Sequence, residues 1–382
     1  MTIPIRTAAM IAALSLLAVA CGGDDNAGDP LAADNTSDAG TTESEQTDDN
    51  QASDEIAIGE DGVDAERADL LGAGATFITP VMLEWIRDNE PGIAVNYQSI
   101  GSGGGIEQFL AQTVDFGSSE RYLDDETLAE AAEERGCEAI QFPVVYGAVT
   151  LAFHDEELDD LILDAEAIAG IFQREVTTYD DPVIAELNPD RDLPDTDIIP
   201  VHRSDGSGTT SVFTTYLEDA ADGWELGSGT EVQWPSGTLG GQGNEGVTAQ
   251  IEQNPGGVGY VNQAYALEND LPSARVVNAD GNPVKATLEA TSDAVETIEV
   301  PDDFQFDILG VGGEGFPIAG TNWIFAWECG YDDETAELLE HFWNWALSPE
   351  ADELALELQY APLGDGLKDR VRDAIERINS AE

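Results

Sequence analysis

The feature that most constrains the fold begins near residue 70, where apolar strand-like runs alternate with amphipathic stretches and glycine-rich turns. Residues 95–100 and 142–153 predict strands, and residues 256–261 predict a turn that leads into a strand. Strands that alternate with helices indicate an α/β fold with covered sheets, and about 315 residues favour two lobes. The predicted helices contain residues 78–86, 106–113, 161–172, 212–220, 335–358 with a break at Pro349, and a last stretch from Leu367.

Residues 1–20 have the layout of a secretory signal, in which Arg6 precedes the apolar run 8–20. That run is too short to span a bilayer, which needs roughly 20 residues. Small residues before Cys21 resemble a bacterial lipobox, where the signal is cleaved and the cysteine thiol receives a lipid. The alternative is ordinary cleavage that leaves a free Cys21. We predict a lipidated Cys21 and an extracytoplasmic protein anchored to the cell membrane.

The segment that follows, residues 21–66, is predicted to be a disordered acidic tether. Residues 22–66 contain fifteen acidic residues and no lysine or arginine, and they show no helical or strand periodicity. Low hydrophobicity with high charge prevents a buried core from forming. A flexible coil of this length has an end-to-end distance of roughly 35–40 Å.

The charge balance excludes some partners. The chain has 14 basic and 78 acidic residues, a formal net charge of −64. Such a chain repels nucleic acids and anionic membrane surfaces, so we expect neither as a partner. An acidic surface suits a protein in salty water, where screening weakens self-repulsion. An anionic ligand would have to be attracted locally against this field.

The remaining cysteines, Cys137 and Cys329, are expected to pair in an oxidising compartment, with two buried free thiols as the alternative. No CxxC motif is present, and His154, His202 and His341 lack ligand spacing. We therefore expect no metal site and no cofactor.

Three glycine-rich loops, residues 72–77, 101–105 and 203–210, each combine glycines with a hydroxyl residue before a predicted helix. Glycine lets the backbone approach a ligand, and the first N–H groups of a helix attract an anion. If the three loops converged, they would hold a tetrahedral oxyanion with the single cation Arg203. Each loop alone is also compatible with an ordinary helix cap or turn.

Enzymatic interpretations of these loops are not favoured. None ends in the GK[ST] of a nucleotide P-loop, and neither Ser102 nor Ser207 lies in a G-x-S-x-G elbow. His202 precedes Arg203 in a predicted strand, so its side chain should point to the opposite face. We expect a binding protein that is not an enzyme.

Taken together, the motifs resemble those of the phosphate-binding proteins of bacterial phosphate ABC importers, the PstS type. The resemblance runs from about Leu70 to the C-terminus, with the motifs in the family's order. The matching segments are residues 72–77, 95–102, 114–119, 203–209, 234–235, 240–244 and 256–261.

The resemblance implies a two-lobed periplasmic-binding-protein fold of type II, with crossover strands and a ligand cleft between the lobes. Residues 67–146 and 317–382 would form lobe I, and residues 147–316 lobe II. Arg203 would pair with the phosphate charge and Asp205 would hold it in place. The implied phosphate-binding residues are Thr76, Phe77, Ser102, Glu120, Arg203, Asp205, Ser207, Gly208 and Thr209.

Glu120 occupies a position where the family usually has aspartate, after an Asp-Phe-Gly run. A carboxylate in an anion site is reasonable only if the ligand brings a proton to donate. Phosphate carries a P–OH group near neutral pH, whereas sulfate carries none and would face an unsatisfied, repelling acceptor. The resemblance therefore implies selectivity for phosphate.

The implied partners are inorganic phosphate and the membrane permease subunits of an ABC importer, and the protein is expected to be a monomer. Three alternatives remain at this point. One is a binding protein for another oxyanion, such as sulfate or molybdate. Another is a phosphate-ester hydrolase on the same fold, and the third is a surface adhesion or sensor module.

Overall fold

The computed structural model describes residues 69–296 and 298–380, all within one compact unit, Ile56–Glu382. The predicted signal, the lipidated Cys21 and the tether 21–66 lie outside the described residues. In the described part of the chain, no helix has the length and apolar character needed to cross a membrane.

The main sheet has the strand order β2-β1-β3-β11-β4-β8-β6-β7, and β12 pairs with β4. A smaller sheet has the order β10-β9-β5. The strands are β1 (Leu70–Gly74), β2 (Val95–Ser99), β3 (Phe116–Ser119), β4 (Ala139–Phe153), β5 (Ile162–Leu163), β6 (Ile199–Arg203), β7 (Leu239–Gly241), β8 (Gly257–Asn262), β9 (Arg275–Val277), β10 (Pro283–Lys285), β11 (Ala319–Trp327) and β12 (Ala361–Pro362).

Helices pack along the main sheet and cover its strands. Helix α2 contacts β1 and β3, and α7 contacts β6, β7 and β8. The helices are α1 (Thr79–Asp88), α2 (Ser102–Leu110), α3 (Asp125–Arg135), α4 (Ala165–Phe172), α5 (Pro182–Leu187), α6 (Gly208–Ala220), α7 (Gly243–Gln253), α8 (Gln263–Glu268), α9 (Leu288–Glu296), α10 (Asp333–Ala346), α11 (Pro349–Glu357) and α12 (Asp365–Ile375), with a short 3-10 turn at Glu156–Leu158.

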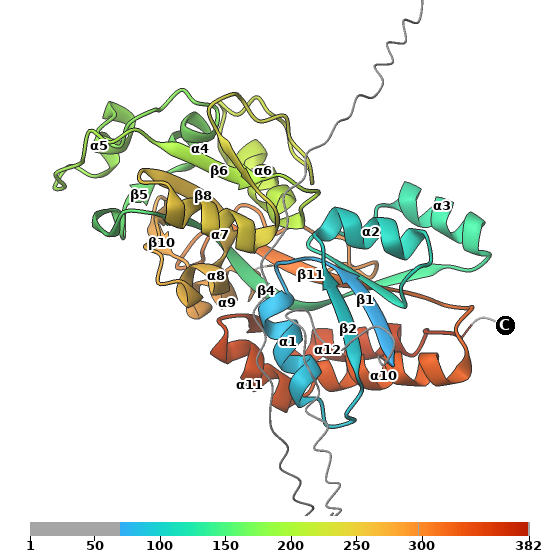
Figure 1. The fold of residues 1–382 in the computed structure, drawn as a ribbon. Helices are drawn as coiled ribbons and strands as arrows, with labels where there is room; N and C mark the ends of the chain where they lie inside the picture. The colour runs from blue at the N-terminus through green and yellow to red at the C-terminus, as the bar shows by residue number, and fades with distance from the viewer. Residues whose placement is uncertain (1–68, 297, 381–382) are drawn as a thin grey trace, which may run out of the picture. The chain divides into compact units, whose positions relative to one another are not determined.

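Strand β4 joins the two halves of the main sheet. Its residues from Ala139 to Ala148 pair with β11, and those from Val149 to Phe153 pair with β8. In Figure 1, β4 and β11 run between the group that holds β1 and β2 and the group that holds β6 and β8. The expected α/β fold with crossover strands is confirmed.

Pro143 lies inside β4, where a proline would normally remove a ladder hydrogen bond. The register shifts at this point: Trp323 pairs with Pro143, but the preceding Asn322 pairs with Val145. A bulge leaves one residue out of the pairing, and such irregularities are where sheets accommodate proline.

The predicted helix over residues 161–172 is wrong at its start. Ile162 and Leu163 form the short strand β5, which pairs with β9. Helix α4 begins only at Ala165, because the side chain of Asp164 accepts a hydrogen bond from the N–H of Ala167. A short apolar run fits a strand as well as a helix, and the distant partner strand decided between them.

Aromatic side chains fill the core on both sides of β4. Trp343 packs edge-on against Phe116 and Phe142 in the part of the core near β1 and β3. Tyr260 stacks on Phe213 with ring centroids 4.3 Å apart in the part near β6 and β8. Each half of the sheet therefore buries a large apolar surface of its own.

Cys137 and Cys329 are joined by a disulfide in the structure, with Cα atoms 6.1 Å apart and 192 residues between them in sequence. The bond links the chain just before β4 to the chain just after β11. The disulfide therefore connects the start of β4 to the end of β11, which are antiparallel neighbours in the main sheet.

Reducing this disulfide is expected to destabilise the folded body by up to about 5 kcal/mol, because it frees a long loop in the unfolded chain. The melting midpoint should fall by roughly 10 °C. Calorimetric melting with and without reductant measures the effect. In a C137S/C329S variant the reductant should change nothing, and an unchanged midpoint in the parent would contradict the prediction.

Candidate functional site

The topology brings the predicted loops to a shared edge. Strands β1, β2 and β3 are parallel, so the segments that follow them leave the sheet on one side. Strands β6, β7 and β8 are also parallel, and their following segments likewise leave together. Ligands of open α/β sheets bind outside such carboxyl ends. Six of the nine predicted residues are linked there by hydrogen bonds: Thr76, Ser102, Glu120, Arg203, Asp205 and Thr209.

Glu120 follows β3 directly and lies at the centre of this network, with only 4% of its surface exposed. The hydroxyl of Ser102 donates to Oε2 of Glu120 at 2.5 Å. The hydroxyl of Thr209 donates to Oε1 at 2.7 Å. One hydroxyl comes from the first turn of α2 and the other from the first turn of α6, so the carboxyl group joins the two predicted anion loops.

Burial raises the pKa of Glu120 above its ordinary value, since removal from water disfavours the charged form. The hydroxyls of Ser102 and Thr209 and the charge of Arg203 act in the opposite direction and offset part of this shift. The carboxyl group therefore changes its protonation state at a higher pH than an exposed glutamate.

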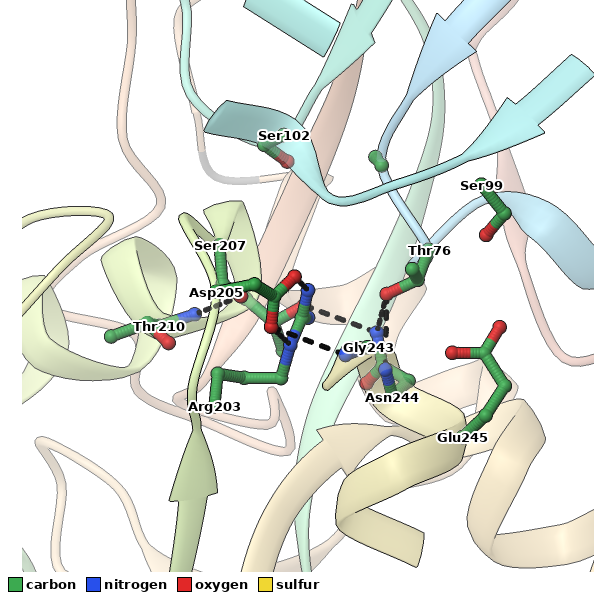
Figure 2. A network of polar contacts seen from close by, with 12 residues as sticks. Thr76, Ser99, Ser102, Arg203, Asp205, Ser207, Thr210, Gly243, Asn244 and Glu245 are labelled. Carbon is green, nitrogen blue, oxygen red and sulfur yellow. Dashed lines mark hydrogen bonds and ion pairs between the residues drawn. The ribbon is translucent and has the colours of Figure 1, made fainter. Parts of the chain in front are cut away.

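Arg203 is the last residue of β6, and its side chain is only 1% exposed. Its Nε donates to Oδ1 of Asp205 at 2.8 Å, and Nη2 donates to Oδ2 at 2.5 Å. The remaining terminal nitrogen, Nη1, donates to the Thr209 hydroxyl at 3.3 Å. The Asp205 carboxylate thus fixes the guanidinium through two parallel hydrogen bonds (Figure 2).

Two glycines let the loops approach closely. Gly101 has φ +87°, and a Cβ atom there would collide with Asp205 and with the carbonyl of Gly206. At Gly208 a Cβ atom would lie 2.6 Å from the Ser102 hydroxyl and also too close to Glu120. The N–H of Gly103 donates to the Gly206 carbonyl at 2.9 Å, so the two loops are in direct backbone contact.

Thr76 and Phe77 follow β1, and both are buried. The Thr76 hydroxyl accepts hydrogen bonds from the backbone and side chain of Asn244. The Phe77 carbonyl accepts a hydrogen bond from the Tyr360 hydroxyl, and the two rings meet edge-on. Phe77 is held by packing, whereas Thr76 belongs to the polar network.

Ser207 and Gly208 lie where α6 begins. The Ser207 hydroxyl accepts from the N–H of Thr210 at 3.0 Å and caps the helix. The helix therefore starts at Gly208, four residues before the predicted Val212 stretch. Gly208 and Thr209 are its first residues, with N–H groups that precede the intrahelical ladder.

Sequence reasoning missed Asn244 as a site residue, although it lies in the matched segment 240–244. It is fully buried in the first turn of α7, and Figure 2 shows it beside Thr76. Glycines precede Asn244 at the start of α7, as they do in the three predicted loops, so the same pattern could have identified it.

His202 does not join the network. Its ring stacks on Trp234 with centroids 5.0 Å apart, and its Nδ1 donates to the Arg203 carbonyl. Burial lowers the pKa of His202. Among residues 69–296 and 298–380, no group of three or more histidine, cysteine or acidic side chains could hold a metal ion.

The sequence itself matches known proteins over most of its length. A family model described as a PBP superfamily domain matches residues 36–350. The Phosphate-binding protein PstS of Xylella fastidiosa (strain Temecula1) is 39% identical over 305 residues, which cover 78% of this chain and 82% of that protein. The chain belongs to the PstS family of phosphate-binding proteins.

Other PstS proteins match at similar levels. The Phosphate-binding protein PstS of Pasteurella multocida is 34% identical and is matched over 79% of this chain and 88% of that protein. The one from Methanocaldococcus jannaschii is 33% identical, and the match covers 72% of this chain and 77% of that protein.

Solved structures support the fold. A high-affinity periplasmic phosphate-binding protein called PfluDING aligns with a TM-score of 0.68 at 21% identity, over 80% of this chain and 93% of that one. A phosphate-binding protein from Stenotrophomonas maltophilia aligns with a TM-score of 0.65 at 20% identity, with the same coverage. These likenesses confirm the two-lobed periplasmic-binding fold.

Proposed function

We propose that this protein captures inorganic phosphate outside the cytoplasm and delivers it to an ABC importer, without catalysing a reaction. Membership of the PstS family supports the ligand. One observation in the structure supports it most directly. A buried carboxyl group, Glu120, lies among hydroxyl donors and a buried arginine in a site otherwise suited to an anion.

That combination of groups suits a protonated oxyanion. Arg203 and the first turns of α2 and α6 attract negative charge at close range. An ionised Glu120 accepts the proton of a P–OH group, which sulfate lacks. The nine residues predicted from the sequence are therefore proposed as the phosphate site, with Phe77 and Gly208 contributing backbone N–H groups.

The proposed lobes are residues 67–146 with 317–382, and residues 147–316. The change of partner along β4 supports a boundary there, since Tyr146 pairs with β12 and Val149 pairs with β8. Two strands, β4 and β11, would then serve as the hinge. The contacts of Thr209 with Glu120 and of Gly103 with Gly206 would form only when the lobes close.

We further propose that the mature protein is anchored by a lipid on Cys21, with residues 21–66 as its tether. The disulfide between Cys137 and Cys329 supports an oxidising, extracytoplasmic location. The permease subunits of the importer are the proposed membrane partners, and the protein is proposed to act as a monomer.

Calorimetric titration of the ligand-stripped protein with phosphate and then sulfate, in high salt near neutral pH, tests the function. We expect saturable binding of one phosphate per chain and no sulfate binding. Binding of both anions would favour a general oxyanion-binding protein. If a folded sample binds neither, the proposal is wrong.

Phosphate association is expected to accelerate as salt is added. The net charge of −64 repels phosphate at long range. Residues 22–66 carry only fifteen of the 78 acidic residues, so most of the negative charge belongs to the rest of the chain. Between about 0.01 M and about 1 M salt the Debye length falls from about 30 Å to about 3 Å, so the association rate should rise by roughly tenfold. Stopped-flow tryptophan fluorescence measures this rate.

The dissociation rate should change much less, because the contacts inside the closed site are short and shielded from salt. An association rate that falls with added salt would mean that the local field of Arg203 and the helix starts outweighs the acidic surface.

A further inference from the structure

Asn244 makes a set of contacts that fixes the direction of two threonine hydroxyls. Its side chain lies between Thr76, which follows β1, and Thr209, in the first turn of α6. It is 0% exposed, so each of its polar atoms must find a partner within the protein.

The orientation of the Asn244 amide is decided by Asn262 at the end of β8. The backbone N–H of Asn262 lies 2.9 Å from Oδ1 of Asn244. A backbone N–H can only donate, so the atom facing it must be the amide oxygen. The NH₂ group therefore faces the two threonines, with one hydrogen for each.

The Thr76 hydroxyl consequently has both acceptor positions occupied. Its Oγ1 accepts from Nδ2 of Asn244 at 2.8 Å and from the backbone N–H of Asn244 at 3.1 Å. A hydroxyl has two acceptor lone pairs and one proton. Its proton must then point away from Asn244 and remain available for an acceptor in the site.

The Thr209 hydroxyl is saturated in the same manner. Its Oγ1 accepts from Nη1 of Arg203 and from Nδ2 of Asn244, each at 3.3 Å. Its proton goes to Oε1 of Glu120 at 2.7 Å. Because Arg203 and Asn244 both donate to this oxygen, the hydroxyl proton is directed toward Glu120.

We infer that Asn244 is a positioning residue that turns the hydroxyls of Thr76 and Thr209 into obligate hydrogen-bond donors toward acceptors in the site. This inference rests on the proposed phosphate function and adds a residue to it. The donors behind the Thr209 hydroxyl, Arg203 and Asn244, lie in the same proposed lobe, so the direction of this hydroxyl is fixed before the anion arrives and needs no reorganisation when it binds. The contact with Thr76 also joins segments on opposite sides of the proposed cleft.

The substitution N244D reverses the donor at residue 244, and because its charge also repels an anion, the double-mutant cycle with T76V separates hydroxyl direction from repulsion. Aspartate keeps the shape and the oxygen that accepts from Asn262, but it replaces the NH₂ donor with an acceptor. Both threonine hydroxyls should then turn to donate to residue 244, and phosphate should bind about 100-fold more weakly by calorimetry. An affinity within about threefold of the parent would overturn the inference.

The pH dependence adds a second readout. Complete burial, with Glu120 on the far side of Thr209, should raise the pKa of an aspartate at residue 244 above the ordinary value of about 3.9, whereas Arg203, which donates to the same Thr209 hydroxyl, offsets part of this shift. Protonation restores a donor, so the ratio of the N244D to the parent dissociation constant should shrink from about pH 8 to about pH 5. A defect that does not depend on the protonation of residue 244 predicts a constant ratio, which would contradict the positioning role.

A double-mutant cycle with T76V tests the proposed route of action, since valine has the shape of threonine without its hydroxyl. The loss caused by N244D should be several-fold smaller in the T76V background, because one of the hydroxyls it misdirects is absent. Strictly additive losses would show that Asn244 does not act through Thr76.

The matched control is N188D. Asn188 is a buried amide between α5 and β5, which donates to the carbonyls of Ile162 and Ile184 and accepts from the N–H of Ile162. Its variant should lower the melting midpoint but leave phosphate affinity unchanged. If N188D weakens binding as much as N244D, the inference fails. If the parent itself binds no phosphate, the proposed function fails and the inference fails with it.

Discussion

Replacing Arg203 with methionine is expected to weaken phosphate binding by roughly 1,000-fold, since it removes the buried cation from the proposed phosphate site. The Arg203 side chain is only 1% exposed, so in the variant water cannot easily reach the site to replace the lost hydrogen bonds. Methionine has a similar length and no charge. Calorimetry or competition with a labelled phosphate analogue measures the change in affinity.

The same substitution should also lower the free energy of unfolding by about 3 kcal/mol, because it leaves Asp205 as an uncompensated, mostly buried carboxylate. Asp205 retains one donor, the N–H of Gly243 at 3.1 Å. One hydrogen bond does not replace the two from Arg203. Chemical denaturation of the parent and the variant measures this effect.

The double variant R203M/D205N separates binding from folding. Asparagine at residue 205 keeps an oxygen for the Gly243 N–H and removes the unpaired charge. Most of the lost stability should return, whereas phosphate affinity should stay roughly 1,000-fold below that of the parent. Recovery of affinity in the double variant would mean that Arg203 serves only to hold Asp205, and that the anion is bound by neutral donors alone.

The second large effect is expected for E120Q, which should lose the discrimination between phosphate and sulfate. The amide NH₂ donates where the carboxylate accepted, so a sulfate oxygen gains a partner in place of a repelling one. We expect the ratio of phosphate to sulfate affinity to fall by at least about 100-fold. Titration of both anions at constant ionic strength gives this ratio.

Two further variants sharpen this test. E120D keeps a carboxylate and should keep most of the selectivity, although the shorter side chain lies farther from Ser102 or Thr209. E130Q removes an exposed charge from α3 and should leave both affinities unchanged. Unaltered sulfate rejection in E120Q would show that Glu120 has no part in selectivity.

The pH dependence of selectivity follows from the raised pKa of Glu120. As the pH falls through this pKa, the carboxyl group gains a proton and becomes a donor. Sulfate binding should therefore appear in the parent protein at acidic pH, whereas in E120Q it should be independent of pH. Selectivity that stays constant through the acidic range would contradict this role.

Protein stability should respond to the same proton. The folded state holds the Glu120 proton more tightly than the unfolded chain does, so this group contributes its full stabilisation below the ordinary carboxyl pKa. The contribution is lost as the pH rises through the raised pKa. Denaturation of E120Q should lack this component, which a comparison of unfolding free energies across pH would detect.

Local sequence patterns predicted most of the fold. The strands at 95–100 and 142–153 follow from apolar runs and β-branched residues, and both are found as β2 and β4. The helices after the glycine-rich loops follow from their spacing of apolar residues. The short strand β5 was missed, because two residues carry no periodicity and only pairing with β9 makes them a strand.

The sequence by itself determined which residue types stand at the helix starts, namely glycines that allow close approach and hydroxyl groups that can donate, and it predicted Arg203 and Glu120 as the cation and the acceptor. Their spacing and order also identified the family. These properties are local, since they depend on side-chain chemistry and on the residues within one turn of a helix.

Only the tertiary structure decided which of these groups meet. Glu120 lies between Ser102 and Thr209 because parallel strands bring their carboxyl ends to one edge, and no sequence spacing encodes that distance. Asn244 acquires its role solely because Asn262 fixes its amide and two threonines from distant segments face it. Hydrogen-bond direction depends on all partners at once, so it is a property of the folded site and not of any motif.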